Sequence, residues 1–473
     1  MTRFTSIALL LGLTAIGMAA CGDSAPPVSA PDRFTIAEPG PIPVIEQQPG
    51  DPAAGYRTVV NRGYMTCGIP YDAFRSSGLM PTGERRLSGR EGLSAELPYM
   101  FNSTVNRDGV DLVVSNCLTC HASEFEGELV IGLGNPFLDF TNDPSVNAEL
   151  LGAFVEDGAP AAAWAKWADR IAAIAPYMVT DTVGVNPAPN LTLALIAHRD
   201  PATLAWHSEP LLEPPPRTPL PTKVPPWWRM QHKAAMFYNG SGRGDHVRYM
   251  MMKSLVCTDD IEEAAEIADW FKDVRAFIAS LEPPAYPFPV EMELAAEGEQ
   301  VFARVCAGCH GSYGAEQNYP NLLIDLETVG TDPAYARQAV ESERFVRWFN
   351  RSFYGQGAEA MPALGYVAPP LDGVWATAPY LHNGSIPSIA ALLDSTQRPT
   401  YWQMRTEPRR YDSDTLGWQF DVLESGKEAA GDPELAKRIY DTTRHGYGNQ
   451  GHTFGDTLSE QERRSLMEYL KTL

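Results

Sequence analysis

Basic side chains are scarce in this chain of 473 residues. Lysine and arginine together number 37, against 59 aspartates and glutamates, so the formal net charge is -22. Neither a basic arm nor a basic helix face is visible along the sequence. Because nucleic-acid binding depends on positive charge that neutralises phosphates, this composition excludes nucleic acid as a partner.

Long hydrophobic runs are equally scarce. Residues 7–20 are apolar, follow a positive charge and end in small residues, which is typical of a secretory signal peptide and too short for a membrane span. Residues 18–21, Met-Ala-Ala-Cys, resemble a bacterial lipoprotein cleavage box, with methionine in the place of the usual leucine. We therefore expect residues 1–20 to be a lipoprotein signal peptide and Cys21 to carry the lipid. An ordinary signal peptide followed by an incidental cysteine is the alternative.

Both interpretations predict a protein outside the cytoplasm. Lipidation of Cys21 would attach the chain to a membrane of the bacterial cell envelope, facing the periplasm or the outer surface. No second apolar run is long enough to span a bilayer, so we expect a soluble body. The proline-rich residues 21–55 would form the tether between the lipid and that body.

Cysteine is also infrequent, with seven residues in the whole chain. One is Cys21, four stand in two Cys-x-x-Cys pairs, and Cys67 and Cys257 are left over. In an oxidising compartment the two remaining thiols are expected to form a disulfide with each other. Two buried free thiols are the alternative.

The two cysteine pairs belong to Cys-x-x-Cys-His motifs, at residues 117–121 and 306–310. Two thiols three positions apart on one helical turn reach the two vinyl groups of a porphyrin, and the next histidine reaches the iron. A zinc site would hold its cysteine pairs closer together, and a thioredoxin-type disulfide would need a βαβ context that the sequence lacks. We therefore expect two covalently bound haem c groups, attached through Cys117, Cys120 and His121, and through Cys306, Cys309 and His310.

No histidine follows the first motif closely. The next four after His121 are His198, His207, His232 and His246. The first iron is therefore expected to lack a strong distal protein ligand, although one of these histidines or a methionine could still approach it. An open sixth position lets oxygen or peroxide bind, and this separates a reactive haem from an electron-transfer haem.

The second iron has better distal candidates. His452 stands in a glycine-rich loop just before the terminal helix, where it could approach a haem face. Met361, which is followed by proline, is the rival candidate. We expect His445 to be a surface histidine.

Segments that alternate between polar and apolar residues are few, whereas helical spacing recurs. It predicts helices over residues 261–281 and 294–305, the second of which runs straight into Cys306. Ser459 and Glu462 form a capping-box pattern before a terminal helix. Residues 111–114 could be strand or helix. We expect a mainly α fold of two cytochrome c-like domains with long loops.

Prolines mark the expected boundaries. Residues 210–226 are rich in proline and end in two tryptophans, which indicates an ordered loop packed on a domain surface. A further group of prolines at 283–289 indicates a domain boundary. We therefore expect an N-terminal haem domain with large insertions over residues 56–285 and a C-terminal cytochrome c domain over residues 286–473.

Residues 369–385 read Pro-Pro-Leu-Asp-Gly-Val-Trp-Ala-Thr-Ala-Pro-Tyr-Leu-His-Asn-Gly-Ser. This stretch resembles the signature after the second haem in the bacterial di-haem cytochrome c peroxidase superfamily. Its residues are most similar to those of the rubber-oxygenase branch, and the same holds for residues 116–122 and for the loop at 451–455. The likeness follows the motif order over roughly residues 60–473.

The resemblance implies two cytochrome c-like domains whose haems exchange electrons. It implies that His121 is proximal to a reactive, oxygen-binding haem, and that His310 and His452 both ligate the second iron. His382 falls on a histidine of the superfamily near the haem interface. We therefore take His121 and His382 as candidate catalytic residues, with a purely structural role for His382 left open.

Two departures from the superfamily are visible. The peroxidases carry a methionine ligand after the His-x-Gly signature, and residues 392–399 supply none here. The chain is also shorter than a typical rubber oxygenase. The aromatic residues Trp227, Trp228, Phe237 and Tyr238 could wall a pocket over the first haem or be ordinary core, and Arg229 and Lys233 could pair with haem propionates.

Three functions are compatible with the sequence. The first is an oxidoreductase that activates oxygen or peroxide at the N-terminal haem and transfers electrons through the C-terminal haem. The second is a non-catalytic electron-transfer cytochrome, and the third is a gas-sensing haem module. We favour the first, with a redox partner protein or a small-molecule oxidant as partner and an organic substrate that the sequence does not identify.

Overall fold

The computed structural model describes residues 33–78, 86–87 and 89–473. The predicted signal peptide and Cys21 lie outside the described residues. The described part of the predicted tether runs along the body of the protein. Its strand β1 (Gly40–Pro41) pairs with β8 (Leu322–Asp325), and the side-chain amide of Asn350 donates to the carbonyl of Arg33 at 3.0 Å. None of the helices in the described ranges is long and apolar enough to cross a bilayer.

The helices of the described residues vary from single turns to five turns. They are α1 (Pro52–Asn61), α2 (Tyr71–Ser76), α3 (Leu118–His121), α4 (Pro144–Gly152), α5 (Ala159–Ile174), α6 (Ala188–Ala197), α7 (His246–Met250), α8 (Ile261–Ala279), α9 (Met292–Val305), α10 (Ala307–His310), α11 (Leu326–Val329), α12 (Ala334–Glu341), α13 (Glu343–Arg351), α14 (Ile389–Leu393), α15 (Pro433–Ala436) and α16 (Glu460–Leu470).

The strands form small antiparallel sheets. The remaining strands are β2 (Ile69–Pro70), β3 (Phe101–Val105), β4 (Asp111–Ser115), β5 (Ala122–Phe125), β6 (Glu128–Ile131), β7 (Gly242–Gly244), β9 (Ala358–Ala360), β10 (Gly365–Val367), β11 (Tyr401–Met404), β12 (Tyr411–Asp412), β13 (Gly417–Trp418), β14 (Phe420–Val422) and β15 (Tyr440–Asp441). They associate in the orders β1-β8-β10, β14-β11-β15, β2-β4-β3, β5-β6, β7-β9 and β12-β13.

The prediction of a mainly α fold is wrong. Helices account for 39% of the residues and strands for 13%, with the strands spread over several small sheets. Most of these strands are two to five residues long, too short to show the alternation by which a strand is recognised in a sequence. Residues 111–114, which were open between helix and strand, belong to β4 and pair with β3.

The helices that the sequence predicts are confirmed. Helix α8 begins behind Asp260, whose side chain accepts from the backbone N–H of Glu263. Helix α9 ends at Val305, directly before Cys306. At the start of α16 both hydrogen bonds of the Ser459–Glu462 capping box are present. These helices have strong local signals, either a cap or a continuous apolar face, and so they form where the sequence indicates.

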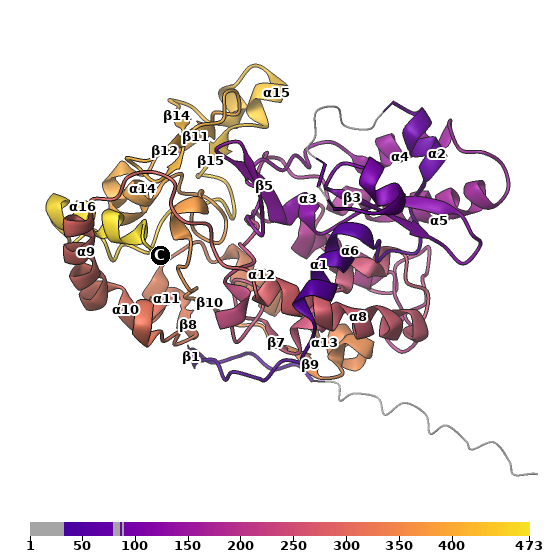
Figure 1. Ribbon diagram of the computed structural model, residues 1–473, viewed down its shortest axis with the longest axis horizontal. Coiled ribbons are helices and arrows are strands. Elements are labelled where there is room, and N and C mark those ends of the chain that lie inside the picture. Colours follow the sequence, from indigo (N-terminus) through magenta and orange to yellow (C-terminus); the bar gives the residue numbers. More distant parts are fainter. Residues whose placement is uncertain (1–32, 79–85, 88) are drawn as a thin grey trace, which may run out of the picture.

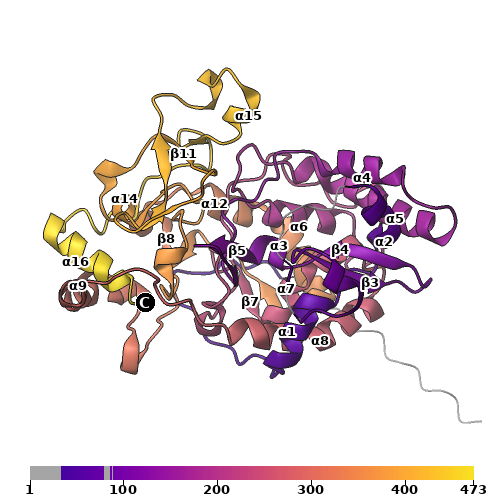
Figure 2. The same cartoon turned by 45° about the horizontal axis from the view of Figure 1, so that its top comes forward.

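The described residues form two large hydrophobic cores. Their helices can be followed in the two halves of the ribbon in Figure 1. The first lies among α1, α6, α7 and α8, and α1 packs against α8. The second is closed by α9 and α16, which lie side by side in both views (Figures 1 and 2). At their crossing a Cβ on Gly298 would collide with the carbonyl oxygen of Ser465, so a glycine is needed for the two helices to approach so closely.

Each core contains residues from the part of the sequence that mainly forms the other core. Helix α13, which follows the second haem motif, places Phe345, Trp348 and Phe349 in the first core. Conversely, Phe125 and Trp228, which precede the proline group at 283–289, belong to the second core. The proline-rich residues 210–226 are ordered, as predicted, and their end lies between the two halves, where Lys223 donates its backbone N–H to the carbonyl of His382.

Candidate haem centres

The first Cys-x-x-Cys-His motif forms a single helical turn, α3. The side chain of Asn116 accepts from the N–H of Leu118 at 2.9 Å, which starts the turn, and Leu118 is fully buried beneath it. The His121 N–H donates to the carbonyl of Cys117 at 3.0 Å. The thiols of Cys117 and Cys120 are free and half-buried. One turn thus presents both thiols and the imidazole, as attachment to one porphyrin requires.

The ring of His121 is fixed in the orientation that an iron ligand needs. Its Nδ1 donates to the carbonyl of Pro225 at 3.2 Å, which leaves Nε2 free for a metal. The ring also stacks on Trp227, with centroids 4.9 Å apart. Burial lowers the pKa of His121 from 6.5 to about 4, so the imidazole is neutral, the form that binds metal, at ordinary pH.

The second motif repeats this arrangement at α10. Helix α9 leads into Cys306, and the N–H of His310 donates to its carbonyl at 3.0 Å. The Nδ1 of His310 donates to the carbonyl of Pro369 at 2.8 Å, so Nε2 is again left for a metal. Cys306 and Cys309 are free and half-buried. Both motifs therefore orient their histidine through a proline carbonyl that lies far away in the sequence.

His452 stands across from His310. Their ring centroids are 6.2 Å apart, and the rings are inclined by 57°. Two imidazoles on opposite sides of one iron, each with a metal–nitrogen bond of about 2.0 Å, would place their ring centres roughly 6 Å apart. The Nδ1 of His452 is buried and has no hydrogen-bond partner among the described residues. This spacing fits an iron held between the two histidines.

The backbone around His452 is held firmly. Its N–H donates to the carbonyl of Val329 at 2.7 Å, and its carbonyl accepts from the guanidinium of Arg398 at 3.1 Å. Arg398 also donates to the carbonyls of Asn449 and Gly451. His452 itself has a φ of 46°, a left-handed conformation that is costly for a histidine and that these bonds maintain.

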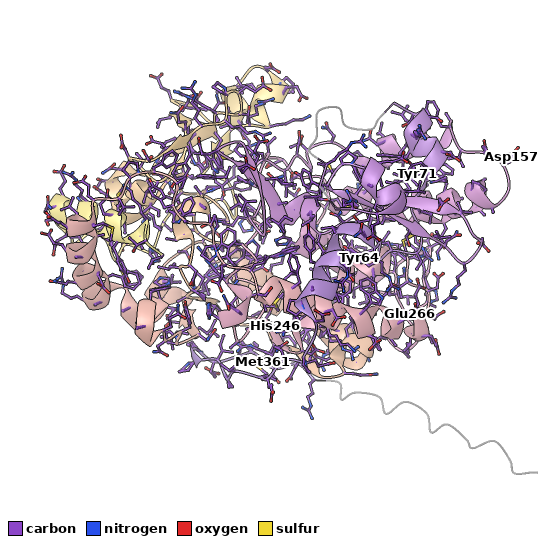
Figure 3. All side chains as sticks on the ribbon, in the orientation of Figure 1. Tyr64, Tyr71, Asp157, His246, Glu266 and Met361 are labelled. Carbon is purple, nitrogen blue, oxygen red and sulfur yellow. A yellow bond between two sulfur atoms is a disulfide. The ribbon has the colours of Figure 1, made fainter. Side chains whose placement is uncertain are left out.

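The rival ligand Met361 lies elsewhere. It follows β9, and its N–H donates to the carbonyl of Ser241, next to β7. In Figure 3 its label stands near that of His246, apart from α10, which Figure 1 places in the other half of the molecule. Of the two candidates for the second iron, the structure thus places His452 opposite His310.

The four histidines that follow His121 lie in different surroundings. His198 stacks on Trp206, and its Nδ1 bonds to the carbonyl of His207. His207 is exposed, and His232 stacks on Tyr319. His246 is buried with both ring nitrogens unpaired among the described residues. Within the described part of the chain, no histidine ring stands across from His121 as His452 does from His310.

Three cations, the buried Arg229 and the half-buried Lys223 and Lys233, lie near the two motifs. Burial lowers the pKa values of Lys223, Arg229 and Lys233, and that of Lys233 falls to about 8. The charge of Arg229 lowers the pKa values of both lysines further, so Arg229 is close enough to each lysine to repel it. Lys223 donates to the carbonyls of Thr377 and Pro379, and Arg229 donates to the carbonyl of Asp372. Haem propionates would supply further anionic partners, which fits the expectation for Arg229 and Lys233.

His382 lies in a cluster of tyrosines. Its ring stacks on Tyr366 at 4.1 Å, and its Nε2 shares a hydrogen bond of 3.1 Å with the hydroxyl of Tyr366. Tyr238 and Tyr335 flank it at 6.5 and 6.2 Å. Burial lowers the pKa of His382 to about 3. No ring contact joins His382 to His121 or His310 among the described residues.

The four aromatic residues proposed to wall one pocket face different surroundings. Trp227 stacks on His121, whereas Trp228 is fully buried in the second core. Phe237 is 46% exposed, and the hydroxyl of Tyr238 donates to the carbonyl of Lys223. Trp227 is therefore the member of this group that touches a haem-binding residue.

Further residues near the haem motifs went unnoticed in the sequence. Tyr64 hydrogen-bonds to Cys117, and the charge of Lys253 acts on both thiols of the first motif. The proline carbonyls at 225 and 369 orient the two histidines. No sequence motif predicts these carbonyls, because every residue has one. Only the fold determines which carbonyl accepts a hydrogen bond from the histidine.

Cys67 and Cys257 form a disulfide in the structure, with Cα atoms 5.2 Å apart. Both residues are buried in the first core, and the bond links the segment after α1 to the segment before α8.

Comparisons with known proteins agree with the second motif. A family model described as RoxA-like, cytochrome c-like matches residues 365–403. A second one, described as cytochrome C oxidase, cbb3-type, subunit III, matches residues 293–381, which include the second Cys-x-x-Cys-His motif.

Two curated proteins of Sinorhizobium fredii are similar to parts of this chain. Uncharacterized protein y4iJ is 32% identical over 261 residues, covering 41% of this chain and 41% of that protein. Uncharacterized protein y4iM is 29% identical over 296 residues, covering 53% of this chain and 64% of that protein. The chain thus spans less than two thirds of either relative. Together with the family models, the geometry shows that the C-terminal half contains a haem c-binding cytochrome region with a RoxA-like segment.

Proposed function

We propose that the chain carries two haem c groups and uses them unequally. The observation that carries this proposal is the contrast between the motifs. His452 stands 6.2 Å from His310, whereas the ring of His121 stacks on Trp227 and faces no second histidine ring among the described residues. The second iron would have two histidine ligands and relay electrons. The first would keep an open position for oxygen or peroxide, and a haem of that kind supplies oxidising chemistry toward an organic substrate.

A continuous chain of bonds connects the two proximal histidines. His121 donates to the carbonyl of Pro225, and three residues later the indole N–H of Trp228 donates to the carbonyl of Asp372 at 2.8 Å. Three residues before Asp372, the carbonyl of Pro369 accepts from His310. Two short segments and three hydrogen bonds thus link the haem sites, which supports electron exchange between them.

A carbon monoxide titration tests the proposal. A reduced haem with an open position binds carbon monoxide, and one with two histidine ligands does not. We expect the reduced holoprotein to contain two haems per chain by haem analysis and to bind one carbon monoxide. The Cys117→Ser/Cys120→Ser variant should retain one haem and bind none. Binding at both haems, or a single haem per chain, would contradict the proposal.

A non-catalytic electron carrier is the second candidate, and the match to a cytochrome c oxidase subunit favours it. In that case both irons would be six-coordinate in both oxidation states. Carbon monoxide would then bind neither reduced haem, and mixing with peroxide would leave the spectrum of the oxidised protein unchanged.

We further propose that the protein acts outside the cytoplasm, held to a bacterial membrane through a lipid on Cys21. The match to a cbb3-type cytochrome c domain supports an extracytoplasmic location. In cell fractionation, the wild-type protein should remain with the membranes and Cys21→Ser should appear in the periplasmic fraction. If both proteins fractionate alike, the lipid anchor is wrong.

A further inference from the structure

A large cleft opens away from both haem motifs. Its volume is about 1090 Å³, at the upper end for small-molecule sites. Three segments form most of its walls: residues 216–220 of the proline-rich loop, residues 332–341 at α12, and residues 426–447, which include β15. Asp181 and Tyr401 complete the lining. Neither Cys-x-x-Cys-His motif contributes a residue to it.

The cleft combines flat apolar walls with a tyrosine on the side of β11. Pro219, Leu220 and Ala334 supply apolar surface, and Tyr401 is half-buried at the edge. The ring of Tyr447 is buried, and its hydroxyl donates to Asp181 at 2.7 Å. Such walls suit an organic molecule with an aromatic or aliphatic body.

Carboxylates outnumber guanidinium groups in the lining by five to two. Three of the five are occupied: Asp181 pairs with Arg444 at 2.5 Å, Asp332 accepts from the N–H groups of Ala334 and Gly448, and Asp441 accepts from Thr443.

The other two carboxylates remain available. Glu341 and Glu428 are exposed and form no hydrogen bond or ion pair with the residues that the structure describes. Arg337 lies one helical turn before Glu341 and is also exposed without such a partner. The free charge of the cleft is therefore negative overall, and the chain as a whole carries -22, which raises the local concentration of cations.

We propose that this cleft binds an organic cation with an aromatic or aliphatic body. Glu341 and Glu428 would attract the positive group, and the face of the Tyr401 ring would add a cation–π contact. The apolar body would lie against the prolines and Leu220. Arg337 opposes the cation and sets a limit on its affinity.

The floor of the cleft connects to the loop that carries His452. One carboxylate oxygen of Asp332 accepts from the N–H of Gly448 at 3.0 Å. Gly451 packs so closely on Gly330 that a Cβ at this position would collide with the backbone. The carbonyl of Asp332 accepts from Tyr366, which bonds to His382. We therefore expect occupation of the cleft to perturb the segment next to the second haem motif, and the haem spectrum gives a second readout.

Calorimetric titration of the holoprotein tests the proposal with two probes that differ chiefly in charge. We expect tyramine to bind and 3-(4-hydroxyphenyl)propionate to bind at least tenfold more weakly. Glu341→Gln and Glu428→Gln should each weaken tyramine binding severalfold, because each removes one attractive charge. Arg337→Gln should strengthen it, because it removes a repulsive one.

Glu299→Gln is the matched control, since Glu299 is an equally exposed glutamate on α9 outside the cleft. It should bind tyramine as the wild-type protein does. Saturation with tyramine should also shift the Soret band of the holoprotein. The proposal is overturned if the propionate binds as tightly as tyramine, if neither probe binds, or if Arg337→Gln weakens tyramine binding.

Discussion

At the scale of single residues, His452 is the proposed second histidine ligand at the C-terminal haem motif. Its backbone adopts a left-handed conformation that Arg398 and Val329 maintain, and its ring is directed at His310. A histidine in such a conformation costs free energy in the apoprotein. Binding of the His452 ring to a metal would offset that cost, which explains why a strained backbone is found at a proposed ligand.

Replacing His452 by alanine should open the second iron. We expect His452→Ala to fold, to keep both haems, and to change the second haem from low-spin to high-spin in the oxidised absorption spectrum. Carbon monoxide should then bind two haems instead of one. Met361→Leu is the control for the rival ligand and should leave both spectra as in the wild-type protein. A low-spin second haem in His452→Ala would show that another residue is the ligand.

His246 should make the protein sensitive to acid. Burial, and then the charges of Arg275 and Lys233, lower the pKa of His246 from 6.5 to about 4. Below pH 6.5 the unfolded chain binds a proton at this histidine that the folded chain does not. The free energy of unfolding therefore decreases as the pH is lowered. Between pH 7 and pH 5 the loss is about 2 kcal/mol.

Urea unfolding of His246→Leu measures this contribution. The difference in unfolding free energy between pH 7 and pH 5 should be smaller in His246→Leu than in the wild-type protein by that amount. His207→Leu, at an exposed histidine, should keep the wild-type difference. An unchanged pH dependence in His246→Leu would mean that His246 is not buried as a neutral imidazole.

At the scale of elements, the sequence predicts helices far better than strands. Helices α8, α9 and α16 carry caps or an apolar face in local sequence, and they form where expected. Strands such as β12 (Tyr411–Asp412) and β15 (Tyr440–Asp441) are two residues long and are defined by partners far away in the chain. A short window of sequence does not contain these long-range pairings, so the sequence predicts a more helical fold than the one observed.

The crossing of α9 and α16 depends on Gly298. A methyl group there would collide with the carbonyl of Ser465 on α16, so the helices would have to separate. We expect Gly298→Ala to lower the free energy of unfolding by about 1–3 kcal/mol, as overpacked cores usually do. Gln300→Ala, at an exposed position on the same helix, is the control. An equal or higher stability for Gly298→Ala in chemical denaturation would contradict this account of the crossing.

The candidate site was predictable in part. The attachment residues Cys117, Cys120, Cys306 and Cys309 could be named because their chemistry fixes their spacing. The carbonyls of Pro225 and Pro369 could not, because only the tertiary fold brings them to the histidines, from 104 and 59 residues away in the sequence. The same holds for the tyrosines around His382, which come from α12, β10 and the loop before β7.

At the scale of the whole molecule, Trp228 links the two haem sites. Its indole N–H is the hydrogen bond that joins the segment held by His121 to the segment held by His310. We expect Trp228→Phe, which removes this bond and keeps a ring, to slow electron transfer between the haems several-fold without changing either haem's coordination.

Flash photolysis of the carbon monoxide complex in the half-reduced protein measures that rate. Trp402→Phe is the matched control, because Trp402 is similarly buried and also donates to a backbone carbonyl, that of Ser385, away from the path. Equal rates in both variants and the wild-type protein would exclude the Trp228 path.

The exchange of segments between the two cores has a consequence for the newly made chain. The first core is incomplete until α13 has been synthesised, more than two hundred residues after His121. The first pair of thiols therefore leaves the ribosome long before its surroundings can close. In the folded chain Cys117 and Cys120 are half-buried. That interval would leave them more accessible to enzymes that attach haem.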